Sequence, residues 1–125
     1  MLHLQRVDPR AVEIALGVEV DMPAVAVLGT DEGAVVGSGG LAWGGGRCWV
    51  WFKMLETKPS YAVPIIRETK RMLKRAVQLG ETEVFTPRDA DEPRSEKLLT
   101  MLGFEMVGRE TLLGRDMEIW RWVNI

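Results

Sequence analysis

The apolar positions of this chain follow a strand-like spacing in some stretches and a helical spacing in others, and the changes of spacing mark the predicted elements. In the first part, short apolar runs alternate with polar or glycine-rich turns, which is typical of a strand meander. The predicted strands of this part are residues 3–7, 23–29, 34–43 and 47–55. Between the first two, residues 8–17 read as a short helix, since Asp8 can serve as its N-cap and Gly17 as its stop.

The predicted strand over residues 47–55 is apolar on both faces. In an extended chain Trp49 and Trp51 point to one side, and Val50 and Phe52 point to the other. A strand with one face in solvent would show polar residues at alternate positions. The pattern therefore predicts a central strand that is covered on both sides.

From Ser60 to Leu79 the apolar spacing becomes helical. The residues that share the predicted core face are Tyr61, Ile65, Met72, Leu73, Ala76 and Val77. Pro64 fixes where this helix begins, because only a first turn tolerates a residue without an N–H. The helix should therefore begin near Ser60, not at Thr57, and end at Gly80.

The last part of the chain predicts a strand, a loop, a helix and a final hairpin. The ranges are residues 82–86 for the strand, 87–93 for the loop, 93–102 for the helix, and 104–114 and 117–123 for the hairpin. Gly103 directly follows the helix, where glycine commonly adopts a left-handed conformation. We expect Phe104 to turn into the core beside Leu98 or Leu102.

Composition indicates a globular protein of one domain over residues 1–125, with 46% hydrophobic and 27% charged residues. The formal net charge of −2 does not favour nucleic acid or an anionic membrane as a partner. We find no signal-peptide pattern and no apolar run of membrane-spanning length, so we expect a soluble, cytoplasmic protein. The one histidine, His3, near the N-terminus, argues against a Ser-His-Asp or Cys-His site and against most zinc sites, and we expect no metal.

The order of elements, together with "RSEKLLTMLGF" at residues 94–104, resembles the GNAT superfamily (Gcn5-related N-acetyltransferases). The matching positions of that short motif are Arg94, Leu98, Leu102, Gly103 and Phe104. By element order the resemblance covers residues 24–123, with a shortened N-terminal segment over 1–23. The chain also resembles small GNAT-like proteins of phages and prophages. The resemblance implies an α+β, three-layer fold: a twisted, mainly antiparallel sheet with helices on both faces.

The resemblance also implies a site for acetyl-CoA. Cofactor-binding positions carried over from it are Met54, Leu55, Lys58, Ser60, Tyr61, Ala62 and Arg94. The backbone at Met54 and Leu55 would pair with pantetheine, and the start of the following helix would hold the phosphates, because a helix N-terminus favours an anion. Glu56, at the end of the central strand, would be the catalytic base, or simply an exposed strand-end glutamate.

Several positions depart from the family pattern. Glu92 stands where the family has asparagine, and Leu99 stands where it has the tyrosine that protonates the leaving thiolate. The glycine-rich phosphate turn is replaced by "KPSYAV" at residues 58–63, in which Pro59 has no N–H. The pyrophosphate loop is therefore degenerate.

Two functions remain open on this reading. The first is an acyl-CoA-dependent N-acyltransferase that acts on a small-molecule or protein amine. The second is a non-catalytic GNAT-fold protein with protein partners in a larger assembly, for example a component of a phage particle, which would place it in a virion. Cys48 is interpreted as a small buried hydrophobic residue and not as a nucleophile. The tryptophan pairs Trp49/Trp51 and Trp120/Trp122 are interpreted as packing residues and not as a ligand-stacking surface.

Overall fold

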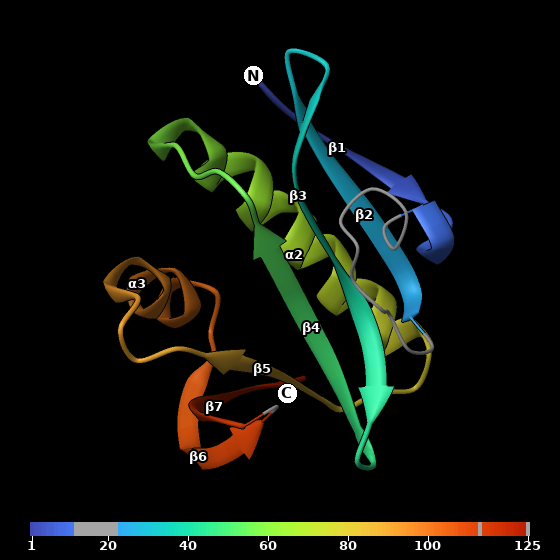
Figure 1. Ribbon diagram of the computed structural model, residues 1–125. Helices are drawn as coiled ribbons and strands as arrows, with labels where there is room; N and C mark the ends of the chain where they lie inside the picture. The colour runs from blue at the N-terminus through green and yellow to red at the C-terminus, as the bar shows by residue number, and fades with distance from the viewer. Residues whose placement is uncertain (12–22, 113, 125) are drawn as a thin grey trace.

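The computed structural model describes residues 1–11, 23–112 and 114–124 (Figure 1). Its strands are β1 (Leu2–Val7), β2 (Pro23–Asp31), β3 (Ala34–Gly44), β4 (Arg47–Met54), β5 (Glu83–Arg88), β6 (Glu105–Leu112) and β7 (Arg115–Val123). Its helices are the short 3-10 helix η1 (Pro59–Tyr61), α2 (Ala62–Gln78) and α3 (Pro93–Met101). The helix predicted over residues 8–17 falls largely outside the described residues.

The strands form one seven-stranded sheet in the order β1-β2-β3-β4-β5-β7-β6. Every neighbouring pair is antiparallel except β4 and β5, which run parallel. Parallel neighbours need a crossover connection, and α2 supplies it (Figure 1). The predicted α+β class and mainly antiparallel sheet are thus confirmed, and β4 is the central strand.

The main core lies between the sheet and α2. Cys48 and Val50 of β4 pack in one cluster with Met72, Leu73 and Ala76 of α2. These residues recur at the spacing that puts them on one helix face and on one side of a strand. The helical spacing of the sequence therefore identified the buried side of α2.

The start of α2 agrees with the prediction from Pro64. A 3-10 turn begins at Pro59 and leads directly into the α-helix at Ala62, so Pro64 lies in the first turn. There the missing N–H removes no helical hydrogen bond. The helix ends at Gln78, and Gly80 follows with a φ of 95°.

The end of α3 is the glycine cap that the sequence predicted. Gly103 has a φ of 91°, and its N–H donates to the carbonyl oxygen of Thr100. The N–H of Phe104 donates to the carbonyl oxygen of Leu99 at 2.9 Å. These two bonds form a Schellman motif, and they turn the Phe104 side chain into the main core together with Leu102.

Strand boundaries were predicted too short at three places: residues 30 and 31 extend β2, residues 115 and 116 begin β7, and residues 87 and 88 extend β5. Residues 87 and 88 were expected in a loop because Pro87 and the polar residues after it resemble a turn. The structure continues β5 through Pro87 and Arg88, which pair with Ile119 and Glu118 of β7. The strand continues because Arg88 is buried and has an ionic partner on the neighbouring strand.

Candidate functional site

The sheet opens between its two parallel strands. Only one pair of Cα partners, Trp49 and Phe85, joins β4 to β5 in the described part of the chain. Figure 1 shows the two strands running apart from there toward their C-terminal ends. The far end of β4 therefore has a strand neighbour on one side only.

The alternation of the strand shows which backbone groups face this opening. The carbonyl oxygens of Trp51 and Lys53 face β3, and the N–H of Leu55 donates to the carbonyl oxygen of Val36 at 2.8 Å. Successive residues of a strand direct their backbone groups to opposite edges. The N–H and C=O groups of Phe52 and Met54 therefore point toward β5, where no strand pairs with them. Of the two backbone positions predicted to meet pantetheine, Met54 has a free N–H and Leu55 does not.

The predicted phosphate cradle is largely occupied by its own turn. The N–H of Tyr61 donates to Lys58 O at 3.0 Å, and that of Ala62 donates to Pro59 O. Pro59 and Pro64 have no N–H to offer. The Ser60 N–H has no backbone acceptor among the described residues. A helix N-terminus binds anions through such free donors, and this one has few.

The charge of Lys58 is also compensated. Its ammonium lies 3.5 Å from Asp31 Oδ2 and 3.6 Å from Glu56 Oε1. The pKa of the Lys58 ammonium is raised above its ordinary value, mainly by the negative charge of ionised Tyr61 and then by the charges of Glu56 and Asp31. Lys58 therefore stays charged. Asp31 also accepts a hydrogen bond of 2.6 Å from the buried Tyr61 hydroxyl. The side chains of Lys58 and Tyr61 are therefore engaged in holding the start of the helix to β2.

Glu56 lies on the surface just after β4. Its side chain is 55% exposed, and its neighbour Leu55 is 59% exposed. The apolar surroundings that would suit a base are thus not formed by these residues. The catalytic role of Glu56 remains a prediction.

The motif residues of α3 have structural roles. The Glu92 side chain caps the helix by accepting the N–H of Arg94 at 3.0 Å, and the Arg94 side chain is exposed. Leu99 packs against the main core. The position of the family's tyrosine therefore holds a packing residue that cannot donate a proton.

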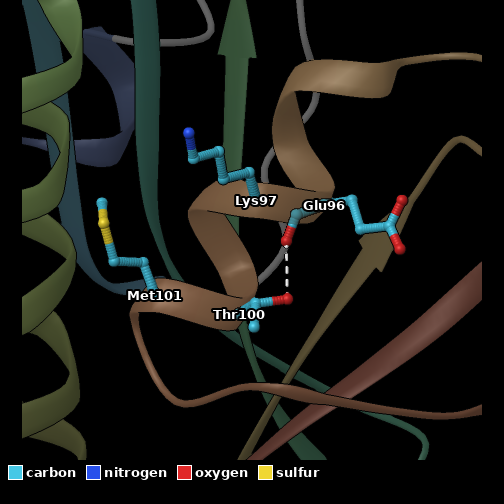
Figure 2. Close-up of a pocket in the computed structure, with 4 residues that line it drawn as sticks. All are labelled: Glu96, Lys97, Thr100 and Met101. Carbon is cyan, nitrogen blue, oxygen red and sulfur yellow. Dashed lines mark hydrogen bonds between the residues drawn. The ribbon is translucent and has the colours of Figure 1, made fainter.

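A shallow hollow of about 500 Å³ lies on the surface of α3 (Figure 2). It is lined by Glu96, Lys97, Thr100 and Met101, none of which the sequence singled out. The Thr100 hydroxyl donates to the Glu96 carbonyl oxygen at 2.9 Å and is therefore already bonded. The hollow contains no predicted site residue.

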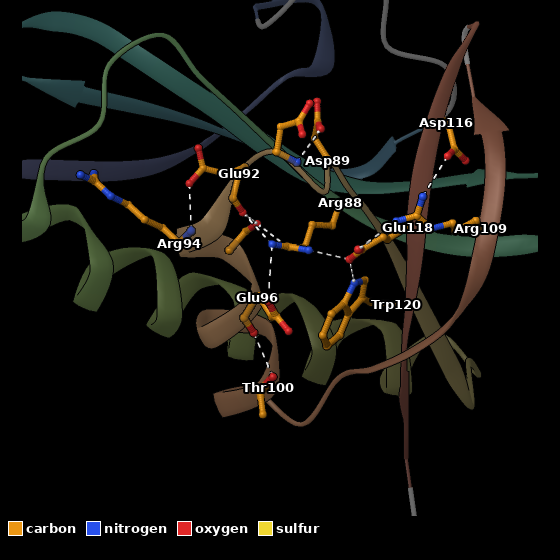
Figure 3. A network of polar contacts seen from close by, with 12 residues as sticks. Arg88, Asp89, Glu92, Arg94, Glu96, Thr100, Arg109, Asp116, Glu118 and Trp120 are labelled. Carbon is orange, nitrogen blue, oxygen red and sulfur yellow. Dashed lines mark hydrogen bonds and ion pairs between the residues drawn. The ribbon is translucent and has the colours of Figure 1, made fainter.

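A buried ion-pair network fixes α3 at the end of β5 (Figure 3). Arg88, whose side chain is 5% exposed, donates to Glu118 at 2.6 Å, to the Ser95 hydroxyl at 2.9 Å and to the Glu92 carbonyl oxygen at 2.8 Å. Glu118 also accepts a hydrogen bond of 2.9 Å from Trp120 Nε1. The hydrogen bond from Trp120, and after it the one from Arg88, lowers the pKa of the Glu118 carboxyl. Sequence reasoning missed this network because it assigned Arg88 to a loop. The signal that could have found it is Glu118, an oppositely charged residue in the last predicted strand that could pair with Arg88 across the sheet.

The face of β4 that carries Trp49 and Trp51 is aromatic and cationic. The Arg47 guanidinium lies 5.6 Å from the Trp49 ring centroid and 4.9 Å from that of Phe85. Trp51 Nε1 is buried without a hydrogen-bond partner in the described part of the chain. Cys48 lies on the opposite, core face of β4. Burial, and to a lesser extent the charge of Glu81, raises the pKa of its thiol to about 11, which fits a packing residue and not a nucleophile.

Solved acetyltransferases share this fold, although no family model and no curated protein sequence matches the chain. The IAA acetyltransferase from Bacillus cereus is 12% identical, with a TM-score of 0.70 over 99% of this chain and 100% of that one. Mutant forms of the spermidine/spermine N-acetyltransferase from Vibrio cholerae are 12% identical, with a TM-score of 0.67 over 98% and 95%. An aminoglycoside acetyltransferase in complex with coenzyme A and kanamycin is 11% identical, with a TM-score of 0.64 over 98% and 95%.

At these identities the likeness establishes the fold. The chain has the fold of the GNAT acetyltransferases, as the resemblance of its element order and of residues 94–104 predicted. No described helix is long and apolar enough to cross a membrane. The likeness to phage proteins remains a prediction.

Proposed function

We propose that the chain is an N-acyltransferase that moves an acyl group from acyl-CoA to a small-molecule amine. The observation that supports it best is the free backbone edge of β4 at Phe52 and Met54, beside the opening between β4 and β5. An extended pantetheine arm can add to such an edge as a further strand would, through its amide groups. This edge fits that arm, whereas the start of α2 offers few donors to a pyrophosphate.

Acyl-CoA would supply a thioester, whose carbonyl carbon is open to direct attack by an amine. In that reaction the C–N bond forms, the C–S bond breaks, the nitrogen loses a proton and the thiolate leaves. The Met54 N–H would stabilise negative charge on the carbonyl oxygen, which is the role backbone donors take in acyl transfer. Leu99 cannot protonate the thiolate, so water takes that part. Glu56, exposed just after β4, is the carboxylate predicted to accept the proton.

The amine class is supported by the similar structures. One is named for spermidine and spermine, and another was solved with kanamycin. These names describe those proteins, and they make polyamines and aminoglycosides the first acceptors to test here.

Three features of the site are the basis of a second candidate, a GNAT-fold protein without catalysis, which the similar structures do not favour. The Tyr61 and Ala62 amides are bonded within the turn, Lys58 is paired with Asp31, and Leu99 replaces an acid. Each change removes a part that binding or turnover would use. Such a protein would act through protein partners in an assembly.

Isothermal titration with acetyl-CoA tests the first proposal, and acetyl-pantetheine is the matched ligand because it keeps the thioester arm and lacks the nucleotide phosphates. If the β4 edge provides the binding, both ligands bind with similar affinity. Incubation with polyamines and aminoglycosides should then release free thiol in proportion to amide formed. If neither ligand binds at millimolar concentration, the acyltransferase proposal is wrong and the non-catalytic candidate stands.

A further inference from the structure

The exposed face of α2 is strongly basic. It carries five exposed cationic side chains, which are Arg67, Lys70, Arg71, Lys74 and Arg75. They recur at the three- and four-residue spacing that brings side chains to one side of a helix, opposite the buried Met72, Leu73 and Ala76. This face has no exposed acidic residue, because Glu68, the one acid in the sequence of α2, is buried.

Most of these positive charges have no ionic partner within the described residues. Arg71 lies 3.2 Å from Glu68, and no ion pair joins the other four cations to a described carboxylate. Like charges three and four residues apart repel one another along a helix, and an acidic surface placed against them relieves that repulsion. Since the whole chain has a net charge of −2, the positive charge belongs to this face and not to the protein in general.

The basic face begins close to the site proposed for the thioester. α2 follows the end of β4, and Arg67 lies about 8 Å along the helix from its first residue, Ala62 (Figure 1). At the same junction the apolar residues Leu55 and Val63 are 59% and 56% exposed. An apolar centre with a charged rim is the usual composition of a protein interface, in which the charges steer the partner.

The start of α2 favours an acyl donor that does not depend on contacts with a pyrophosphate. The Tyr61 and Ala62 amides donate within their own turn, and two carboxylates already compensate the charge of Lys58. The nucleotide of acyl-CoA therefore finds few partners here. A donor that holds the same thioester arm on a protein gains affinity from the protein surface instead, and an acidic protein complements the α2 face.

We infer that the basic face of α2 is a docking surface for an acidic carrier protein, which brings the acyl group as a thioester on a pantetheine arm. The inference rests on the proposed function for the reaction and names its donor class. The amine nitrogen bonds to the thioester carbonyl carbon and gives up a proton, the C–S bond breaks, and the thiolate takes a proton from water, so the carrier leaves with a free thiol. Nucleic acid fits this face less well, because the sequence of α2 has no aromatic side chain on which a base could stack.

Acetyl transfer from two donors is the first measurement. One donor is acetyl-pantetheine, and the other is the same arm carried by an acetylated acyl carrier protein, which is acidic. With a polyamine or aminoglycoside as acceptor, kcat/KM from thiol release should be about tenfold or more higher for the carrier. The difference should shrink as salt is added, because salt screens exposed charges. Equal kcat/KM for the two donors at low salt overturns the inference.

Lys70→Glu/Lys74→Glu is the second measurement. Each new carboxylate lies three residues after an arginine, Arg67 or Arg71, so the helix gains opposite-charge neighbours and should still fold. We expect kcat/KM with the carrier to fall by about tenfold or more, and kcat/KM with acetyl-pantetheine to stay unchanged. Undiminished activity with the carrier in this variant overturns the inference.

Arg6→Glu/Lys97→Glu is the matched control. It makes the same change in net charge at exposed residues of β1 and α3, away from α2. Activity with either donor should stay as in the unaltered protein. If this variant loses activity with the carrier as strongly as the α2 variant, net charge and not the α2 face is responsible, and the inference is overturned.

The two proposals fail in different ways. If acetyl-pantetheine is used and the carrier is used no better, the docking surface is wrong and the function stands. If no donor releases thiol with any acceptor, the proposed function is wrong, and fluorescence polarisation of a labelled carrier tests the surface alone: binding that Lys70→Glu/Lys74→Glu abolishes supports it. Stronger binding of a double-stranded oligonucleotide or of phosphatidylglycerol vesicles than of the carrier overturns the inference.

Discussion

Gly39→Ala should destabilise the protein because β3 has no room for a methyl group at this position. The added Cβ would lie 2.6 Å and 2.7 Å from two Phe52 ring atoms and 2.8 Å from the Trp51 carbonyl oxygen. Overpacking of this kind costs about 1–3 kcal/mol. Because alanine also restricts the unfolded chain, which returns about 0.4–1 kcal/mol, we expect a net loss of about 1–2 kcal/mol. The melting temperature should fall by about 3–8 °C for a chain of this size.

Gly44→Ala is the matched control in the same strand, because nothing lies within 4 Å of its Cβ position and its φ is ordinary. Its melting temperature, measured by circular dichroism, should stay unchanged or rise. Phe52→Leu in the Gly39→Ala background should recover about 1 kcal/mol relative to the sum of the single changes, since smaller side chains relieve the ring contact. Equal melting temperatures of Gly39→Ala and Gly44→Ala, or strictly additive effects with Phe52→Leu, would refute the packing argument.

Three further changes test other parts of the structure. Gly103→Val should lower stability by about 1–2 kcal/mol or more in chemical denaturation, because valine resists a φ of 91°; an unchanged midpoint contradicts the cap. Glu118→Gln should make the free energy of unfolding depend less on pH in the acid range. Hydrogen bonds from Trp120 and Arg88 hold the pKa of Glu118 below 4.5 in the folded protein, so its stabilising contribution is present above pH 4.5 and is lost as the pH falls. If plots of unfolding free energy against pH run parallel for the two proteins, this argument is contradicted. Ser38→Ala should be neutral or stabilising by up to about 1 kcal/mol, because its buried hydroxyl has no partner in the described chain; a clear loss shows a missed partner.

The sequence predicted the fold well where one physical signal acted alone. Apolar residues on both faces of β4 identified the central strand, and helical spacing identified the buried side of α2. Pro64 and Gly103 gave the helix limits, because each has a backbone property that no other residue shares. These signals are local, and neighbouring elements do not change them.

The site was harder to predict because it depends on pairing between distant segments. Pro87 looks like a turn residue on its own, and only the register of β5 with β7 shows that it stays in a strand. The resemblance placed donors at Tyr61 and Ala62 but could not show that their own turn uses them. The pairing of Lys58 with Asp31 joins residues far apart in the sequence, so no local pattern reveals it.

The two halves of the expected acyl-CoA site have therefore diverged to different extents. At the phosphate end, the N–H groups of Tyr61 and Ala62 already donate to carbonyl oxygens of their own turn. Lys58 lies beside two carboxylates, so a phosphate that binds there must compete with Asp31 and Glu56. At the thioester end, the β4 backbone at Phe52 and Met54 has no strand partner toward β5, since Trp49 and Phe85 are the one pair of Cα partners between these strands in the described part of the chain. The proposed function therefore depends on the β4 edge more than on the start of α2, which its own contacts already occupy.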